Sequence, residues 1–230
     1  MIGIIGAMAI EVAPLLSELL DPQEDILSGR TFHRGIMRGH EAVVVQCGVG
    51  KVNAAMCTEA LILTYRPSLV INVGVAGALT GALRVGDVAV AKDLVQYDVD
   101  TTAVGDPLGL VSTVNRIDFP CAEWAVKKIM CAAGEMDIRA SVVRIASGDR
   151  FNDDPQTTRL ITEYFHAEAC EMDACPIGQV CLVNGVECAV IRGISDSTEG
   201  VHSDEYSQFN AFAAERAAGL LLSFLNLLGR

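Results

Sequence analysis

Short apolar runs alternate with longer segments of helical spacing along most of the chain. The runs that predict buried strands cover residues 2–5, 68–75, 85–95, 141–147 and 188–191. Strands covered on both faces have no side turned to water, so their sequences lack polar alternation. The segments that predict helices cover residues 9–20, 52–65, 122–133, 155–165, 172–184 and 207–228. Together these elements indicate an α/β protein.

Two stretches add detail to this pattern. Residues 31–35, 36–38 and 41–46 are typical of a meander of short strands with Gly39 in a tight turn. The last predicted helix is amphipathic, with one approximate apolar face formed by Phe209, Phe212, Leu220, Phe224 and Leu227. The chain has no internal repeat, low-complexity tract or linker, so we expect residues 1–230 to form a single domain.

Composition and charge restrict the function classes further. Hydrophobic residues make up 51% and charged residues 20% of the chain, which suits a compact core and excludes disorder. The formal net charge of -12 argues against nucleic acid and against an anionic membrane, because both are bound through clustered Lys and Arg. The sequence has neither a signal peptide pattern nor a membrane-spanning apolar run, so we expect a soluble, cytoplasmic protein.

The cysteines and the glycine-rich turns predict neither a metal site nor a cofactor. The eight cysteines lack zinc-site spacing, and we interpret them as small buried hydrophobic residues. The turn Gly48-Val49-Gly50-Lys51 fails as a P-loop, because Val45 stands where the first glycine is needed and Val52 replaces Ser or Thr. The turns at 3–6 and 74–77 lack the spacing of a dinucleotide fingerprint. No ATP or NAD site is therefore expected.

Four acids stand near the ends of predicted strands or the starts of predicted helices: Glu11, Glu171, Asp173 and Asp196. Taken singly, each is explained as a helix-terminal acid beside the positive end of a helix dipole. Ligands of open α/β sheets bind at the carboxyl ends of strands, so the same acids could instead form one pocket for acid–base chemistry. Composition alone leaves both interpretations open.

Six motifs follow one another along the chain. They are Gly-Ile-Ile-Gly-Ala-Met followed by Glu11, Cys-Gly-Val-Gly-Lys-Val, Asn-Val-Gly-Val-Ala-Gly, Ser-Gly-Asp-Arg-Phe, Glu-Met-Asp and Arg-Gly-Ile-Ser-Asp. In this order and spacing the sequence resembles, over essentially its whole length, the bacterial 5'-methylthioadenosine/S-adenosylhomocysteine nucleosidases of the purine nucleoside phosphorylase superfamily. The resemblance implies a homodimer of nucleoside phosphorylase-like subunits. Each subunit would be a three-layer α/β/α sandwich around a mixed, partly barrel-like sheet.

The resemblance also implies a reaction, hydrolysis of a purine N-ribosidic bond. Asp196 is implied to be the general acid that protonates the purine N7, with Ser195 holding it in place. Glu11, assisted by Arg192, is implied to orient and deprotonate the attacking water. An acid on the leaving group and a base on water at the opposite face is also the arrangement of inverting glycosidases.

Further positions are implied to bind the nucleoside. Phe151 would stack on the base while the backbone at Asn152 reads its edge, and Met172 and Asp173 would hold the ribose. The other implied contacts are Met8, Val75, Ala76, Gly77, Glu171 and Tyr206, with Thr101 and Val104 closing the pocket of the partner subunit. The chain departs from the usual family residues at Asp173 (Glu), Val75 (Ser), Asn152 (Ile) and Val104 (an aromatic residue). The shorter Asp173 could draw its carboxylate away from the ribose hydroxyls.

Three functions follow as hypotheses. The leading one is hydrolysis of 5'-methylthioadenosine and S-adenosylhomocysteine in salvage metabolism. A second is a related hydrolase for futalosine or another 5'-modified adenosine, and a third is a nucleoside-binding protein with little catalysis, which the pairing of Glu11 with Asp196 disfavours. Phosphorolysis is disfavoured because the Gly-Asp-Pro-x-Arg turn of the phosphorylases is replaced by Gly-Ala-Met-Ala-Ile-Glu, whose carboxylate would repel phosphate.

Overall fold

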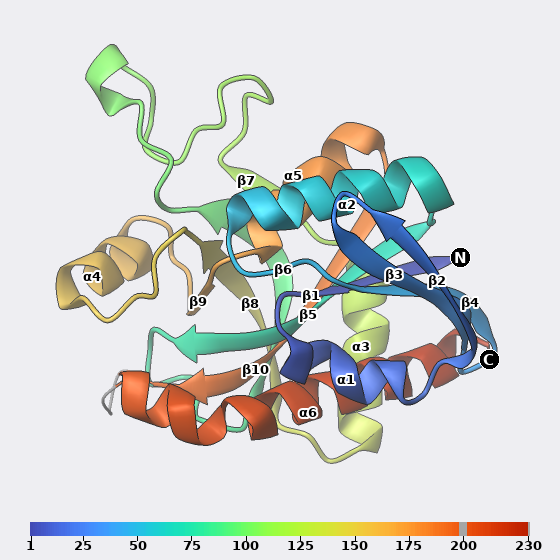
Figure 1. The fold of residues 1–230 in the computed structure, drawn as a ribbon. Coiled ribbons are helices and arrows are strands. Elements are labelled where there is room, and N and C mark those ends of the chain that lie inside the picture. Colours follow the sequence, from blue (N-terminus) through green and yellow to red (C-terminus); the bar gives the residue numbers. More distant parts are fainter. Residues whose placement is uncertain (198–201, 230) are drawn as a thin grey trace.

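The computed structural model describes residues 1–197 and 202–229, and the strands within these ranges form one mixed sheet of ten (Figure 1). The strands are β1 (Ile2–Gly6), β2 (Leu20–Leu27), β3 (Arg30–Met37), β4 (His40–Gln46), β5 (Leu69–Ala78), β6 (Val88–Gln96), β7 (Asp118–Pro120), β8 (Ala140–Ser147), β9 (Ala169–Glu171) and β10 (Glu187–Asp196). The helices are α1 (Ala9–Leu16), α2 (Lys51–Tyr65), the short 3-10 helix η1 (Thr102–Val104), α3 (Glu123–Glu135), α4 (Pro155–Glu163), α5 (Ala174–Asn184) and α6 (His202–Leu228). The α/β class is confirmed.

Part of the sheet closes on itself. Strand β10 pairs in parallel with β5 and antiparallel with β6, and β6, β8, β9 and β5 pair in turn, so that five strands form a ring. Beyond β5 the sheet continues outside this ring, through β1, β4 and β3 to the edge strand β2. The mixed, partly barrel-like sheet is therefore confirmed.

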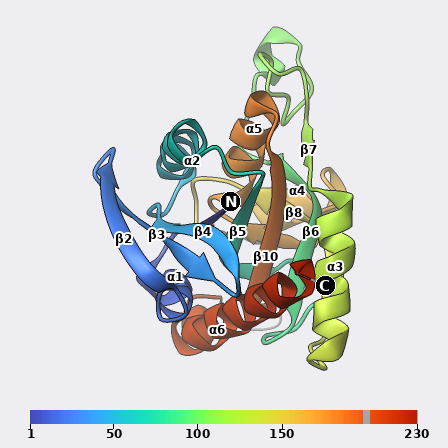
Figure 2. The same cartoon turned by 90° about the vertical axis from the view of Figure 1, so that its right-hand side faces the viewer.

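Helices cover the sheet on two sides. Helices α2 and α5 pack on each other in one layer, while α6 contacts α1, α3, β5 and β10 in the other (Figure 2). Between these layers β1 is buried along its whole length and β10 along all of it except Glu187. This arrangement is the expected three-layer sandwich of a nucleoside phosphorylase-like fold.

The long C-terminal helix differs from its prediction in two respects. It begins at His202 rather than at residue 207, and its buried side includes the small residues Ala213 and Ala217. Phe212, which was predicted on the apolar face, is 48% exposed. Small side chains are needed on the buried face because the Ala213 carbonyl comes so close to β10 that a Cβ at Gly193 would lie 2.0 Å from its oxygen.

Residues Ser203–Leu228 of α6 are also long and apolar enough to cross a membrane, judged by length and composition only. The packing of α6 against β5, β10, α1 and α3 accounts for this apolar composition, because the core helix of a globular protein meets the same test.

The prediction of a helix reaching residue 20 is wrong. Helix α1 ends at Leu16, and the edge strand β2 follows it. Among the described strands, β2 pairs only with β3, and it exposes Leu20 together with the polar residues after it. It therefore carries no apolar pattern that a sequence could reveal. The predicted break in the strand at 31–38 is also absent, since β3 is continuous.

Strand β10 continues five residues beyond the apolar run that predicted it, to Asp196. Arg192, Ser195 and Asp196 therefore belong to the strand itself and are buried. An irregularity in register between Ile194 and Asp196 sets Asp196 opposite Gly77 of β5. The polar end of β10 is thus placed against β5, where the cavity described next begins.

Candidate active site

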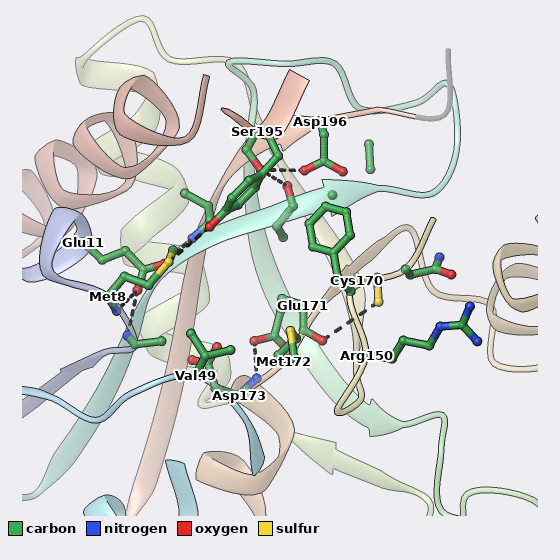
Figure 3. Close-up of a pocket in the computed structure, with 18 of the residues that line it drawn as sticks. Met8, Glu11, Val49, Arg150, Cys170, Glu171, Met172, Asp173, Ser195 and Asp196 are labelled. Atoms are coloured by element: carbon green, nitrogen blue, oxygen red, sulfur yellow. Dashed lines mark hydrogen bonds between the residues drawn. The ribbon is translucent and has the colours of Figure 1, made fainter. Parts of the chain in front are cut away.

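A cavity lies where β5, β9 and β10 end beside the start of α1 (Figure 3). Its empty space, including the part open to solvent, is about 650 Å³, which is the size of a small-molecule site. Its lining consists of Ala7, Met8, Glu11, Val49, Val75, Ala76, Gly77, Ala78, Leu79, Arg150, Phe151, Asn152, Cys170, Glu171, Met172, Asp173, Ser195, Asp196 and Tyr206. All four acids singled out in the sequence are in this set, so the structure brings them together in one cavity.

Glu11 is fixed by backbone amides in the first turn of α1. One carboxylate oxygen accepts hydrogen bonds from the N–H groups of Ala7 (2.7 Å) and Met8 (2.8 Å), and the other accepts one from Val75 (3.0 Å). Burial, together with the negative charge of Asp173, nevertheless raises the pKa of Glu11 to about 7. A carboxylate that gains and loses its proton near neutral pH meets the requirement for a general base.

Asp196 is held at the other end of the cavity. Ser195 Oγ donates a hydrogen bond to Asp196 Oδ1 at 2.7 Å, with the carbonyl oxygen of Ala76 at 3.4 Å as its other acceptor. A Cβ at Gly77 would lie 2.6 Å from Asp196 Oδ2, so only glycine leaves room for the carboxylate in this place. Figure 3 shows Asp196 beside Ser195 and Glu11 beside Met8, on separate parts of the lining.

A buried guanidinium organises the floor of the cavity. Arg192 is fully buried, and its Nη2 atom contacts the carboxylates of Glu171 (2.6 Å) and Asp173 (2.8 Å) and the side-chain oxygen of Asn72. The Asn72 amide also donates to Asp173 Oδ2 at 3.0 Å. The short side chain of Asp173 is therefore tied to Arg192 and Asn72 through one of its two oxygens.

Glu171 completes this buried cluster. Its Oε1 atom accepts a hydrogen bond from Ser147 Oγ, and Oε2 accepts from the N–H groups of Asp173 (2.9 Å) and Ala174 (2.8 Å) where α5 begins. Burial raises the pKa of Glu171 to about 7 in spite of the favourable charge of Arg192. One cation, Arg192, thus faces the carboxylates of Glu11, Glu171 and Asp173, and burial raises the pKa of both glutamates.

Arg192 does not itself line the cavity. Its Nη1 atom and Glu11 Oε1 both pack on Gly74 of β5, where an added Cβ would lie 2.2 Å from Nη1 and 2.4 Å from Oε1. The guanidinium acts on Glu11 electrostatically, as one of the influences that lower its pKa. Among the implied contacts in the subunit's own cavity, Arg192 is the one that lies outside the lining.

Aromatic side chains form the wall near the mouth of the cavity. The rings of Phe151 and Tyr206 meet edge to face with 5.5 Å between centroids, and the Tyr206 hydroxyl lies 3.2 Å from the sulfur of Met8. Phe151 remains 41% exposed, so its ring offers a stacking surface to a planar ligand. Asn152 donates from its side-chain amide to Thr158 Oγ1 at 2.9 Å.

Two predicted positions lie elsewhere, and several lining residues were missed. Thr101 precedes η1 and Val104 ends it; neither contributes to the cavity of its own chain, and Val104 is 81% exposed. The missed lining residues are Ala7, Val49, Ala78, Leu79, Arg150 and Cys170. Most are ordinary apolar residues that carry no chemical signal. Asn72, missed as a partner of Asp173, could have been noticed as a lone polar residue inside an apolar strand.

The described residues contain no group of three or more His, Cys, Asp and Glu side chains that could hold a metal ion. All eight cysteines are free, and seven of them are buried, in agreement with their interpretation as small core residues.

Comparisons with known proteins agree with this geometry. The sequence matches the phosphorylase superfamily over residues 1–226. It is 38% identical to a 5'-methylthioadenosine/S-adenosylhomocysteine nucleosidase of Geobacillus thermodenitrificans, over 98% of this chain and 96% of the relative. Among solved structures, a mutant nucleosidase of the same name from Helicobacter pylori, with 5'-methylthioadenosine in its active site, superposes with a TM-score of 0.94 at 32% identity, covering 98% of both chains.

A structure of futalosine hydrolase from Helicobacter pylori superposes nearly as well, with a TM-score of 0.93 at 33% identity over 98% of this chain and 97% of that one. Superfamily match, sequence identity and fold agree along essentially the full length. The chain thus belongs to the phosphorylase superfamily and, within it, to the 5'-methylthioadenosine/S-adenosylhomocysteine nucleosidases, which are N-glycosidic hydrolases acting on purine nucleosides.

Proposed function

We propose that this protein hydrolyses the N-ribosidic bond of 5'-methylthioadenosine and S-adenosylhomocysteine, releasing adenine and the 5-thioribose product. The observation that carries the proposal is the meeting of Glu11 and Asp196 in one cavity, although they are separated by nearly the whole chain. Relatives named as nucleosidases for these two substrates support the choice of nucleoside.

In the proposed reaction, Asp196 donates a proton to N7 of the purine as the bond between N9 and C1' breaks. Ser195 keeps the Asp196 carboxyl in place through the bond at 2.7 Å. Glu11 accepts a proton from the water whose oxygen attacks C1', so that the base leaves neutral and the sugar gains a hydroxyl. The negative charge of the cluster around Asp173 and Glu171 stabilises the cationic ribosyl group as it forms.

Water is favoured over phosphate as the nucleophile. Among the described residues, the lining contains four carboxylic acids and a single basic residue, Arg150, whose side chain is mostly exposed. The other nearby cation, Arg192, is engaged with Glu171 and Asp173 beneath the cavity. A phosphate dianion entering this site would meet like charges without a matching clamp of basic side chains.

The proposal includes a homodimer in the cytoplasm that serves methionine salvage, with Thr101 and Val104 reaching the pocket of the partner subunit. Support comes from the exposed apolar residues Val52 (77%), Met56 (39%) and Val104 (81%), which would be costly to leave in water. The loop that carries Val104 projects on the same side of the molecule as α2 in both ribbon views (Figures 1 and 2).

A second candidate is hydrolysis of futalosine or another 5'-modified adenosine by the same mechanism. The close superposition on the structure of futalosine hydrolase supports this candidate. A third candidate, nucleoside binding with little catalysis, needs no proton-exchanging group. Binding alone would not explain why the cavity contains a buried glutamate, Glu11, with a pKa of about 7.

Release of purine base from each nucleoside, with and without phosphate, tests these alternatives. We expect 5'-methylthioadenosine and S-adenosylhomocysteine to be cleaved with kcat/KM at least about tenfold above that for futalosine, a preference that differing pocket contacts can supply. The sugar product should be the free sugar at every phosphate concentration. A sugar 1-phosphate product would refute hydrolysis, and measurable binding without base release would favour the binding protein.

A further inference from the structure

Three loops that follow strands β4, β6 and β8 meet beside the cavity. The first, 47–50, contributes Val49 to the lining, and the third, 148–154, contributes Arg150, Phe151 and Asn152. The second begins at Tyr97 and supplies none of the lining residues found in the described ranges of the chain. It nevertheless bonds to the third loop and to Lys51, the first residue of α2, which directly follows the first loop.

The three loops are joined by a closed ring of three hydrogen bonds. Lys51 Nζ donates to Asp98 Oδ1 at 2.6 Å, and the Asp149 N–H donates to Asp98 Oδ2 at 2.9 Å. The Lys51 N–H donates to Asp149 Oδ1 at 2.7 Å, which closes the ring. The Lys51 and Asp98 side chains are only 19% and 29% exposed, so their ion pair is better shielded than an ordinary surface pair.

The loop after β8 is also braced by the residue next to Asp98. The Tyr97 hydroxyl donates to the Arg150 carbonyl at 3.3 Å. A Cβ at Gly148 would lie 2.3 Å from the Tyr97 ring, so the start of the loop rests directly on that ring. Tyr97 and Asp98 together restrain residues 148–150, and Phe151 follows immediately.

The ring of hydrogen bonds among Lys51, Asp98 and Asp149 also explains the Gly-Val-Gly-Lys turn, which is not a phosphate loop. Asp149 supplies a carboxylate to the first N–H of α2, where negative charge is favourable beside the helix dipole. Gly50 has φ of +100° and lies against Asp149, since an added Cβ would be 3.1 Å from Asp149 Oδ1. The turn thus brings Lys51 and Val49 together with Asp149, and its helix terminus receives a carboxylate of the protein itself.

We propose that Lys51, Asp98 and Asp149 form a loop clamp that positions Phe151 and Asn152 for binding the purine base. The three are positioning residues, because they act through the loop they hold. The inference rests on the proposed function insofar as it names a purine nucleoside as the ligand. The restraint of the loop itself does not depend on that activity.

Steady-state kinetics of the full-length Lys51→Met and Lys51→Arg variants test the functional part. We expect Lys51→Met to raise KM for 5'-methylthioadenosine about tenfold while kcat changes by less than about threefold, because ground-state and transition-state contacts to the base weaken alike. Lys51→Arg keeps the charge and should return KM to within about threefold of the unmodified chain. Lys127→Met is the matched control, since it removes an exposed ion pair with Glu123 and should leave KM unchanged.

Hydrogen exchange separates failure of the clamp from failure of the proposed function. In the unliganded chain, Lys51→Met should increase amide exchange in a peptide covering residues 147–154 by at least about tenfold, because it loosens the Asp98 carboxylate that accepts the Asp149 N–H. A peptide from α3 should be unaffected. Unchanged exchange in 147–154 would overturn the clamp whatever the substrate is, and increased exchange with unaltered KM would overturn its role in binding.

Discussion

At the scale of single residues, backbone contacts determine what the acids of the cavity can do. Glu11 accepts its three hydrogen bonds from backbone N–H groups although Val75 stands where the family usually has serine. The Val75 contribution is unaffected because it comes from the backbone and not from the side chain. Asp173 lacks the reach of a glutamate and is tied to Arg192 and Asn72. The residue types were visible in the sequence, whereas their partners were not.

Asp196→Asn tests the assignment of the general acid. The amide keeps the size of the side chain but has no acidic proton to give to N7, so we expect turnover to fall by about 10²- to 10⁴-fold. Affinity for 5'-methylthioadenosine, measured by calorimetry, should stay within about threefold.

Asp137→Asn is the matched control for this substitution. Asp137 is exposed just beyond α3 with φ of +52°, a conformation that asparagine also tolerates, so base release should be unchanged. Near-normal turnover in Asp196→Asn would show that another group protonates the base.

At the scale of elements, the apolar strands and most helices could be predicted from their periodicity, but their ends could not. Strands β5 and β10 extend into the cavity because each pairs with the other beyond its apolar run. Strand β2 was missed because an edge strand needs no apolar face. The apolar face predicted for α6 was only partly right: Leu220 and Phe224 are buried, but the close approach to β10 selects small residues where Phe212 was expected.

Gly193→Ala tests that close approach. The new Cβ would lie 2.0 Å from the Ala213 carbonyl oxygen, so α6 and β10 must move apart, and we expect a loss of about 2 to 4 kcal/mol in the free energy of unfolding. The measurement is the midpoint of urea-induced unfolding, together with the slope of the free energy of unfolding against urea concentration.

Gly134→Ala serves as its control. Gly134 lies in α3 with nothing within 4 Å of an added Cβ, and alanine should stabilise this helix by about 0.5 to 1 kcal/mol. Equal midpoints for the two variants would mean that α6 adjusts to β10 without strain.

At the scale of the whole molecule, the fold brings acids from two distant parts of the chain, Glu11 and the Glu171–Asp173 pair, around one buried arginine from a third. One arginine cannot neutralise three buried carboxylates, and burial raises the pKa of both Glu11 and Glu171 to about 7. That residues 1–230 unfold as a single domain stays a prediction, for which one cooperative urea transition is the expected sign.

The raised pKa of Glu11 makes stability and activity respond to pH in opposite directions. The folded chain binds the Glu11 proton more tightly than the unfolded chain does, so this contribution to stability is complete below about pH 4.5 and is lost as pH rises through about 7. Glutamine resembles the protonated acid at every pH. The unmodified chain should therefore lose stability relative to Glu11→Gln between pH 5 and 8.

Over the same range kcat/KM should rise through pH 7, because a general base must be ionised to act. Urea unfolding and base-release rates at each pH provide the two measurements. Parallel pH dependence of stability in the unmodified chain and Glu11→Gln would show that Glu11 is ionised throughout.

The amino-acid sequence by itself determined the α/β class, most of the buried strands and the identity of the acids, since apolar periodicity and residue chemistry are local properties. The six motifs also identified the family. Only the tertiary structure decided that Glu11 and Asp196 share a cavity, that Arg192 lies beneath it, and that Lys51, Asp98 and Asp149 bond to one another. These contacts join residues far apart in the chain, and burial, which changes the pKa of an acid, arises only when the strands and helices pack.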